Sequence, residues 1–289
     1  MSRLKIGLAL GSGAARGLAH IGVLEVLEKE GIPIDMIAGT SSGAIIGAVY
    51  AKTKNAKSMR PLAIAFGLRR MRYFTDFAIP HANAVRPVAK ALRLQKFKYF
   101  SDLAVPWRGI IKGHHIEEEL QSLVGYNTEF KDLQIPLSCV AVDIDKGEEV
   151  VITDGKVWEA IRASSSIPVI ITPMEWRGRN LVDGLLLNPI PTKTVRDMGA
   201  DYVISVNVLP RKAASNTLES NIVSIMLKSF YLLDSMLVET SMSAADAVIE
   251  PDVIGISFTD FHRAKECIEA GAAATRLAIP GIKKKLGLS

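Results

Sequence analysis

The chain has 289 residues, of which 48% are hydrophobic and 22% are charged, and its formal net charge is +5. This balance excludes a long disordered protein, which would be poorer in apolar residues. Its two cysteines, Cys139 and Cys267, lie far apart and form no CxxC pair, which excludes a disulfide framework and a zinc site. Because no apolar run approaches the roughly 18 residues of a membrane-spanning helix, we expect a soluble, cytoplasmic chain.

The first fifty residues predict a strand, a loop, a helix, a second strand, a turn and a second helix. Short apolar runs indicate the two strands, and apolar residues at helical spacing indicate the first helix, with Gly31 placed to cap it. The predicted elements are the strand Ile6–Leu10, the helix from Leu18 to its cap at Gly31, the strand Met36–Ala38 and the helix Gly43–Ala51.

The stretch 52–113 is strongly basic. Between Ala51 and Gly113 there are fourteen Lys and Arg residues but only two acidic residues, Asp76 and Asp102. Fourteen against two gives +12, and since the whole chain carries +5, the remainder carries −7. Apolar and aromatic residues from Pro61 to Tyr99 alternate with these cations, a composition typical of helices on a membrane surface.

We therefore predict that residues 52–113 form a basic helical insertion, or cap, that docks on anionic lipid. Such a protein would be peripheral at the inner membrane surface. A solvated cap without membrane contact is the alternative. Nucleic-acid binding is disfavoured because no recognised binding module is present.

The rest of the chain alternates apolar strands with helices, which predicts an α/β fold with a mostly parallel sheet covered on both faces. The predicted helices are Ile116–Val124, Val157–Ala163, Leu218–Thr240 and His262–Leu277. The predicted strands are Leu137–Ile144, Glu149–Thr153, Asn180–Val182, Tyr202–Val208, Val248–Glu250 and Ile254–Phe258. We predict one domain over residues 1–289, with residues 214–289 as a C-terminal extension whose long apolar helix is a candidate homo-oligomer interface.

Residues Gly39 to Gly43 read Gly-Thr-Ser-Ser-Gly and match G-x-S-x-G between a predicted strand and a predicted helix. A sharp turn at this point is expected to lift the Ser41 side chain clear of the sheet and to leave its Oγ exposed at a helix N-terminus that favours negative charge. The N–H of Ser42 can hold an oxyanion there. This context predicts a serine nucleophile, and a turn rich in glycine and serine without chemistry is the alternative.

The segment Gly11–Gly17 joins the first strand to the first helix, and its small residues can expose backbone N–H groups to an anion. It is not a P-loop, because no Gly-Lys-Ser/Thr ends it. One hypothesis is a dinucleotide loop, with Asp35 placed to bind a ribose. A connector without a ligand is another.

A further hypothesis makes this loop the oxyanion hole for Ser41. It uses the N–H groups of Gly13 and Ala14, while Arg16 braces the loop or adds positive potential. Adjacent parallel strands would bring the loop and the Ser41 turn together at the carboxyl edge of the sheet. Only this hypothesis uses both features in one reaction.

A serine nucleophile needs a proton acceptor. Asp183 ends an apolar strand and precedes Gly184, although an ordinary Asp-Gly turn would look the same. Among the histidines, His262 is the best alternative, because it follows Asp183 in the Ser…Asp…His order of α/β-hydrolases. His114 and His115 lack the spacing of a metal site.

The Gly11–Gly17 loop, the Gly39–Gly43 turn and Asp183–Gly184 together resemble the patatin-like phospholipase family, in particular its bacterial branch related to the neuropathy target esterase catalytic domain. The similarity covers roughly Lys5 to Val208. It also includes the runs His20–Leu24, Ala163–Pro168 and Asn188–Pro191.

The resemblance implies a three-layer α/β/α fold and a Ser–Asp dyad without histidine. Ser41 is then the nucleophile and Asp183 the base, and Gly13, Ala14 and Arg16 fall in the oxyanion loop. The implied reaction is hydrolysis of an acyl ester of a phospholipid or lysophospholipid through an acyl-serine intermediate, with no metal and no cofactor. The alternatives are a dinucleotide-binding oxidoreductase and a weakly active lipid-binding regulatory module.

Two positions depart from the family's usual pattern. Ala14 stands where glycine is usual and would be strained if φ there is positive. Leu185 follows Gly184 where small residues are typical, which would narrow the pocket. The dyad also requires Asp183 to be partly desolvated, because an ordinary aspartate, with a pKa of about 3.9, is a weak base toward serine.

Overall fold

The computed structural model describes residues 3–73, 114–209 and 236–288, together with residues 229 and 232. Most of the predicted basic insertion 52–113, and most of the predicted helix Leu218–Thr240, lie outside the described residues. The membrane-facing role of the insertion and the oligomer interface therefore stay predictions.

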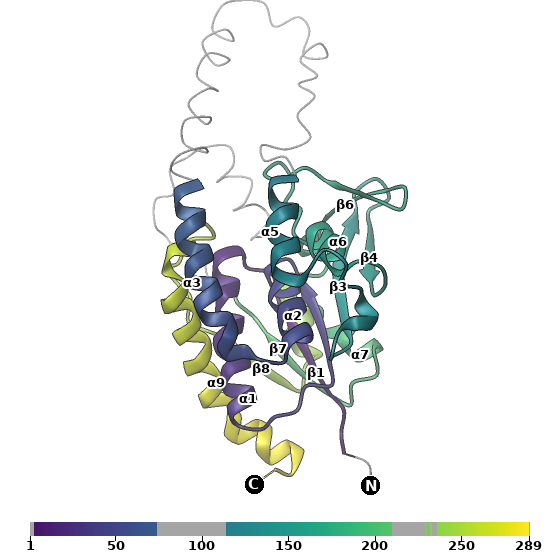
Figure 1. The fold of residues 1–289 in the computed structure, drawn as a ribbon. Coiled ribbons are helices and arrows are strands. Elements are labelled where there is room, and N and C mark those ends of the chain that lie inside the picture. The colour runs from purple at the N-terminus through teal and green to yellow at the C-terminus, as the bar shows by residue number, and fades with distance from the viewer. Residues whose placement is uncertain (1–2, 74–113, 210–228, 230–231, 233–235, 289) are drawn as a thin grey trace, which may run out of the picture.

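One mixed sheet of eight strands organises the described chain (Figure 1). Its hydrogen-bonded pairs link β5–β6–β3–β2–β1–β7–β8 in turn, and β4 pairs with β3 along the edge that β2 and β6 leave open. The strands are β1 (Ile6–Leu10), β2 (Met36–Thr40), β3 (Leu137–Asp143), β4 (Glu148–Ile152), β5 (Met174–Trp176), β6 (Arg179–Asp183), β7 (Tyr202–Val206) and β8 (Ala247–Ile249). The run β3–β2–β1–β7–β8 is parallel throughout, whereas β4 and β6 pair antiparallel with β3, and β5 pairs antiparallel with β6. The mostly parallel sheet that the sequence predicts is confirmed.

Helices cover both faces of this sheet. They are α1 (Ala19–Lys29), α2 (Ser42–Thr53), α3 (Ala56–Tyr73), α5 (His114–Val124), α6 (Val157–Ser164), α7 (Thr192–Asp197) and α9 (Ala264–Leu286). Along β1, Leu8 and Leu10 belong to the larger core, formed with α1, α2, α6 and α9. Ala9 points the other way, into a smaller core with Val195 of α7 and Val238. These alternating faces make the three-layer α/β/α arrangement.

Helix α9 packs along α1 and α3, as Figure 1 shows. The helices approach closely because glycines lie at the crossing: a Cβ on Gly22 would stand 1.9 Å from the carbonyl oxygen of Ile268. A Cβ on Gly271 would stand 2.0 Å from the carbonyl oxygen of Ala19. Helix α9 is thus part of the larger core.

Two predictions about the C-terminal extension are wrong. Residues Ile254–Phe258 form turns rather than a strand, since the Ile256 N–H bonds to Val253 and the carbonyls of Ile256 and Phe258 accept from the glycine loop. The closing helix does not stop at Leu277, because Ile279 and Ile282 are buried and hold it to the core beyond Pro280.

Cys139 on β3 and Cys267 on α9 are buried free thiols. None of the helices in the described ranges has both the length and the apolar character that crossing a bilayer requires.

Candidate active site

The predicted sharp turn is present between β2 and α2. Ser41 has φ of 55° and ψ of −120°, a left-handed backbone that a residue with a Cβ seldom adopts. Glycine is required on both sides of it: a Cβ on Gly39 would lie 2.6 Å from the backbone of Ala44, and one on Gly43 would lie 2.1 Å from the carbonyl oxygen of Leu10. The turn therefore places Ser41 at the N-terminal end of α2, where the helix dipole favours negative charge. The predicted exposure of Ser41 is wrong: the residue is only 3% exposed, because the glycine loop and Asp183 pack against the turn.

Strand register explains how Asp183 comes to this turn. Strand β3 pairs with β4 along one edge, from Cys139 to Asp143. Its other edge is shared, because β2 pairs with it up to Val140 and β6 pairs with it from Ala141 onward, running the opposite way. The two strands therefore meet end to end: β2 finishes at Thr40, opposite Val140, and β6 finishes at Asp183, opposite Ala141.

Gly184 makes this meeting possible. A Cβ at that position would lie 2.4 Å from the carbonyl oxygen of Val140 and 3.1 Å from the side chain of Thr40. A larger residue would push β6 away from the end of β2. The glycine after the aspartate is thus a packing requirement of the junction, and this arrangement is tighter than an exposed Asp-Gly turn.

The Asp183 carboxyl is fully buried. Its Oδ1 accepts a hydrogen bond of 2.9 Å from the N–H of Leu185, whose side chain is itself buried. Burial raises the pKa of Asp183 to about 7, while the Ser41 side chain and the Leu185 N–H act in the opposite direction. The contact with Ser41 falls short of regular hydrogen-bond geometry, and Oδ2 has no hydrogen-bond partner among the described residues. The desolvation that a Ser–Asp dyad requires is present.

The glycine loop leaves two N–H groups available. The N–H of Gly11 donates to Val206 and that of Ser12 donates to Pro189, which fixes the start of the loop. By contrast, the N–H groups of Gly13 and Ala14 donate none of the hydrogen bonds found within the described residues. Ala14 has φ of 49°, so the strain expected of a residue with a Cβ at this position is present.

The loop and the Ser41 turn touch, as the sequence predicts for neighbouring parallel strands. The loop continues into a 3-10 helix, η1 (Ala14–Leu18), and a Cβ on Gly17 would lie 2.1 Å from the Ser42 hydroxyl oxygen. Ser42 is the first residue of α2, so its N–H has no acceptor within that helix. Backbone donors from the loop and from α2 therefore lie on adjoining segments.

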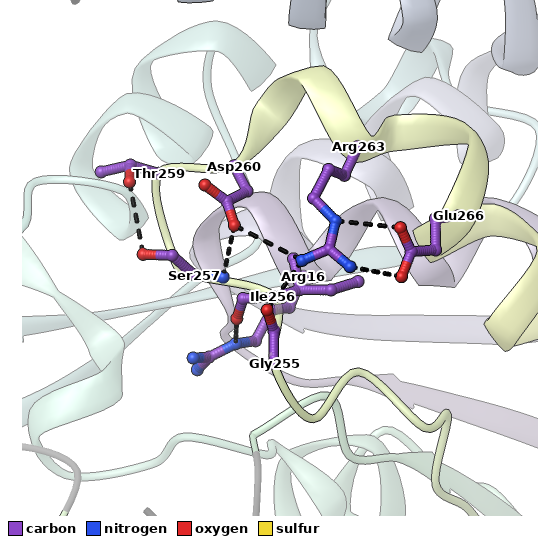
Figure 2. A network of polar contacts seen from close by, with 8 residues as sticks. All are labelled: Arg16, Gly255, Ile256, Ser257, Thr259, Asp260, Arg263 and Glu266. Carbon is purple, nitrogen blue, oxygen red and sulfur yellow. Dashed lines mark hydrogen bonds and ion pairs between the residues drawn. The ribbon is translucent and has the colours of Figure 1, made fainter. Parts of the chain in front are cut away.

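The Arg16 side chain is directed at the turn around Ile256 and thereby supports the glycine loop (Figure 2). Its side chain is 9% exposed, and its Nε donates to the Ile256 carbonyl oxygen at 2.6 Å. The N–H of Ala15 donates to the carbonyl of Phe258 in the same turn. Of the two roles predicted for Arg16, the structure displays bracing.

The turn that receives Arg16 is itself fixed by ionic contacts (Figure 2). Arg263 donates to the Gly255 carbonyl oxygen at 2.7 Å and forms an ion pair with Glu266. Asp260 accepts from the Ser257 N–H at 2.8 Å and lies 3.7 Å from Arg263. The glycine loop is thus supported by a segment that lies more than 230 positions later in the sequence. No local sequence pattern predicts this contact.

Two histidines lie near these segments, and neither is among the contacts of the Asp183 side chain in the described residues. His20 is fully buried, and its Nε2 donates to the Gly11 carbonyl at 2.8 Å, since a carbonyl can only accept. Burial lowers its pKa to about 4, so the ring is neutral and anchors the loop. His262 is exposed on a 3-10 helix, η5 (Phe261–Arg263), and the contacts of the Asp183 side chain are with Ser41 and Leu185.

Asp35 is not placed for a ribose. Its carboxylate forms two hydrogen bonds with Arg3, of 2.6 and 2.7 Å, and accepts from the N–H of Ile6 at 2.8 Å. It immediately precedes β2, so it lies at the amino edge of the sheet, whereas the glycine loop follows the carboxyl end of β1. Asp35 therefore cannot serve as the ribose-binding residue that the dinucleotide hypothesis requires.

Sequence reasoning missed the residues that hold the backbones of Ser41 and Asp183. The Ser41 N–H donates to the Ser164 hydroxyl, and the Asp183 N–H donates to the Ser166 carbonyl. Both serines belong to the run Ala163–Pro168, which contributed to the family resemblance without a role. Three consecutive serines at the end of a helix were the available signal.

Comparison with known proteins gives a consistent result. A family model described as patatin-like phospholipase matches residues 8–196. The protein named lysophospholipase NTE1 of Mycosarcoma maydis is 33% identical over 208 residues, which are 71% of this chain and 10% of that protein. Its namesake in Scheffersomyces stipitis is 31% identical over 211 residues, 72% of this chain and 12% of that protein. The chain therefore spans only a small part of the length of these relatives.

Among solved structures, VipD from Legionella pneumophila is similar with a TM-score of 0.48 and 13% identity, over 97% of this chain and 67% of that one. The type III effector protein ExoU gives a TM-score of 0.46 and 14% identity, over 100% of this chain and 54% of that one.

Proposed function

This chain belongs to the patatin-like phospholipase family, and on that premise we propose that it is a serine acyl hydrolase that cleaves lipid acyl esters. Ser41 is the nucleophile and Asp183 the base. The observation that carries the proposal is the end-to-end meeting of β2 and β6, which brings the Ser41 side chain to a buried carboxyl whose Oδ2 has no hydrogen-bond partner in the described part of the chain.

The first half-reaction transfers the acyl group to the enzyme. As Ser41 Oγ attacks the ester carbonyl carbon, its proton passes to Asp183 Oδ2, and the negative charge develops on the carbonyl oxygen. The N–H groups of Gly13, Ala14 and Ser42 stabilise that charge, aided by the N-terminus of α2. When the carbon–oxygen bond of the ester breaks, Asp183 returns the proton to the leaving alcohol.

The second half-reaction frees the enzyme. Water attacks the acyl-serine and gives a proton to Asp183, which passes it to Ser41 Oγ as the fatty acid leaves. A carboxyl with a pKa of about 7 suits both directions of transfer, because it accepts and releases a proton near neutral pH. We assign this proton to Oδ2, which accepts no hydrogen bond from the residues that the structure describes.

We propose phospholipids and lysophospholipids as the substrate class. The relatives named lysophospholipase align with this chain over about 70% of its length. The basic stretch 52–113 adds a means of approaching anionic lipid, and peripheral attachment to such a membrane would follow from it.

The test uses three proteins and two readouts. Wild type should hydrolyse a lysophosphatidylcholine and a p-nitrophenyl acyl ester, and a fluorophosphonate probe should label it at Ser41. Ser41→Ala should not be labelled, and its kcat should fall at least about 1,000-fold. The kcat of Asp183→Asn should fall at least about 100-fold. Far-ultraviolet circular dichroism checks that both variants stay folded. Labelling of Ser41→Ala, or substantial turnover by Asp183→Asn, would contradict the dyad.

A further inference from the structure

Ser164 connects the nucleophile turn to the sheet. It ends α6 and is fully buried. Its hydroxyl accepts a hydrogen bond of 2.8 Å from the Ser41 N–H and donates one of 2.6 Å to the Val140 carbonyl oxygen. Val140 is the residue of β3 at which pairing with β2 ends. The Ser41 N–H lies beyond the last pair of the strand and before the first residue of α2, so Ser164 supplies its acceptor.

Ser166, two residues further on, holds the other member of the dyad. Its carbonyl oxygen accepts a hydrogen bond of 3.0 Å from the Asp183 N–H. Its hydroxyl lies between two groups of Arg162: it accepts from Nη1 at 2.5 Å and donates to the backbone carbonyl at 2.9 Å. A single turn at the end of α6 therefore contacts both Ser41 and Asp183.

Arg162 stabilises that turn from the interior. Its side chain is only 2% exposed, and its Nη2 donates to the Thr172 carbonyl at 2.9 Å. The nearest carboxylate, Glu117 on α5, lies 3.6 Å from Nε. Burial lowers the pKa of the guanidinium, while Glu117 acts in the opposite direction. Because a buried cation adds little net stability, a role in fixing the geometry of the turn better explains the buried position of Arg162.

We propose that the turn formed by Arg162, Ser164 and Ser166 positions the dyad, with Ser164 setting the Ser41 turn and Arg162 setting the Asp183 end through Ser166. This proposal rests on the proposed function, since it assigns these residues to the same reaction. They are positioning residues, because they act through Ser41 and Asp183 and not on the ester itself.

The decisive variant is Ser164→Ala, with Ser165→Ala as its matched control. Both serines are buried in the same turn, but the Ser165 hydroxyl donates to the Ile161 carbonyl within its own helix, 2.7 Å away. Loss of the Ser164 hydroxyl leaves the Ser41 N–H and the Val140 carbonyl without a partner. We expect kcat and the rate of fluorophosphonate labelling to fall about 10- to 100-fold, with KM changed less than about twofold. Ser165→Ala should stay within about twofold of wild type.

Two more measurements separate positioning from general loss of structure. Ser164→Thr keeps the hydroxyl and should recover most of kcat. Hydrogen–deuterium exchange of the peptide that contains Ser41 should be faster in Ser164→Ala and unchanged in Ser165→Ala. Equal kcat in the two alanine variants would overturn the proposal. So would a fall in kcat accompanied by a large rise in KM that Ser164→Thr does not reverse.

Arg162→Lys decides the matter if Ser164→Ala does not fold. Lysine keeps the charge but lacks the planar fork that reaches Ser166 from Nη1 and Thr172 from Nη2, so kcat should fall about 5- to 20-fold at constant KM. Wild-type kcat in Arg162→Lys would overturn the proposal. A wild type without Ser41-dependent turnover would show instead that the proposed function has failed, before any of these variants is compared.

Discussion

Asp183 combines two properties that oppose each other at the scale of one residue. Full burial makes its carboxyl a stronger base than an exposed aspartate, and the same burial makes its ionised form costly to the fold. Each property gives a measurable pH dependence, and the two run in opposite directions. In its proposed role as a base, Asp183 must be ionised to act, whereas the folded chain is most stable when Asp183 is protonated.

The pH dependence of turnover follows from the pKa of Asp183. Because the base is ionised only above its pKa, kcat/KM should rise about tenfold per pH unit up to about 7 and then level off. A pH series with a soluble acyl ester measures this limb. His262→Ala should keep both the limb and the plateau, since His262 is exposed and does not contact the carboxyl. Loss of activity in His262→Ala would restore the triad.

The stability of Asp183→Asn should depend on pH with a defined sign. Between pH about 4 and about 7 the folded chain binds more protons at this site than the unfolded chain, so the free energy of unfolding falls as pH rises through that window. Asparagine does not ionise, so Asp183→Asn lacks this decrease in the free energy of unfolding. We expect the variant to be more stable than wild type at pH 8, by up to about 4 kcal/mol, and nearly equal to it at pH 4.

Asp35→Asn is the control of opposite sign. Its hydrogen bonds to Arg3 lower the pKa of the Asp35 carboxyl, so the ionised form contributes stability above the ordinary pKa. The Arg3 side chain is 62% exposed, which limits this contribution to about 1 kcal/mol or less. Thermal melts of Asp35→Asn at pH 8 should therefore show a small decrease in Tm. An increase there, or a decrease for Asp183→Asn, would show that the assigned environments are wrong.

At the scale of elements, the crossing of α1 and α9 is the contact that ties the C-terminal helix to the fold. Gly271→Ala places a methyl group where the Ala19 carbonyl stands, so the helices must separate. We expect a loss of about 3 kcal/mol in the free energy of unfolding, measured by urea denaturation. Gly281→Ala on the same helix should instead gain about 0.5–1 kcal/mol, because its Cβ meets no atom within 4 Å and alanine favours helix. Equal effects of the two changes would contradict the close crossing.

At the scale of the whole molecule, the family match ends at residue 196, but the described core continues beyond it. Helix α9 and the turn that receives Arg16 both lie past that residue and support elements near the N-terminus. The organisation of residues 1–289 as one domain stays a prediction.

The uneven charge of the whole chain gives a further test. The protein should co-sediment with phosphatidylglycerol vesicles but not with phosphatidylcholine vesicles, and 0.5 M NaCl should release it. Exchanging Lys96 and Lys98 for glutamate should weaken binding. The same exchange at Lys284 and Lys285 changes the net charge by the same amount but lies outside the basic stretch 52–113, so it should not weaken binding. Binding that is indifferent to lipid charge and salt would refute the surface-docking hypothesis.

The sequence by itself determined the local features. The strand–turn–helix around Ser41, the glycine loop and most strands of the sheet follow from rules that reach only a few residues, such as backbone sterics and apolar periodicity. For that reason Ser41, Gly39 and Gly43 could be assigned from the sequence alone.

Only the tertiary structure decided which distant segments meet. The approach of Asp183 depends on β6 taking the same edge of β3 as β2, and strand pairing over more than 140 residues has no local signal. Other features of the site also depend on tertiary packing. They are the raised pKa of Asp183, the hydrogen bond from the Ser41 N–H to Ser164, and the hydrogen bond from Arg16 to the Ile256 carbonyl. The physical reason is the same in each case: burial and hydrogen-bond partners are properties of neighbours in space, and the chain order does not list them.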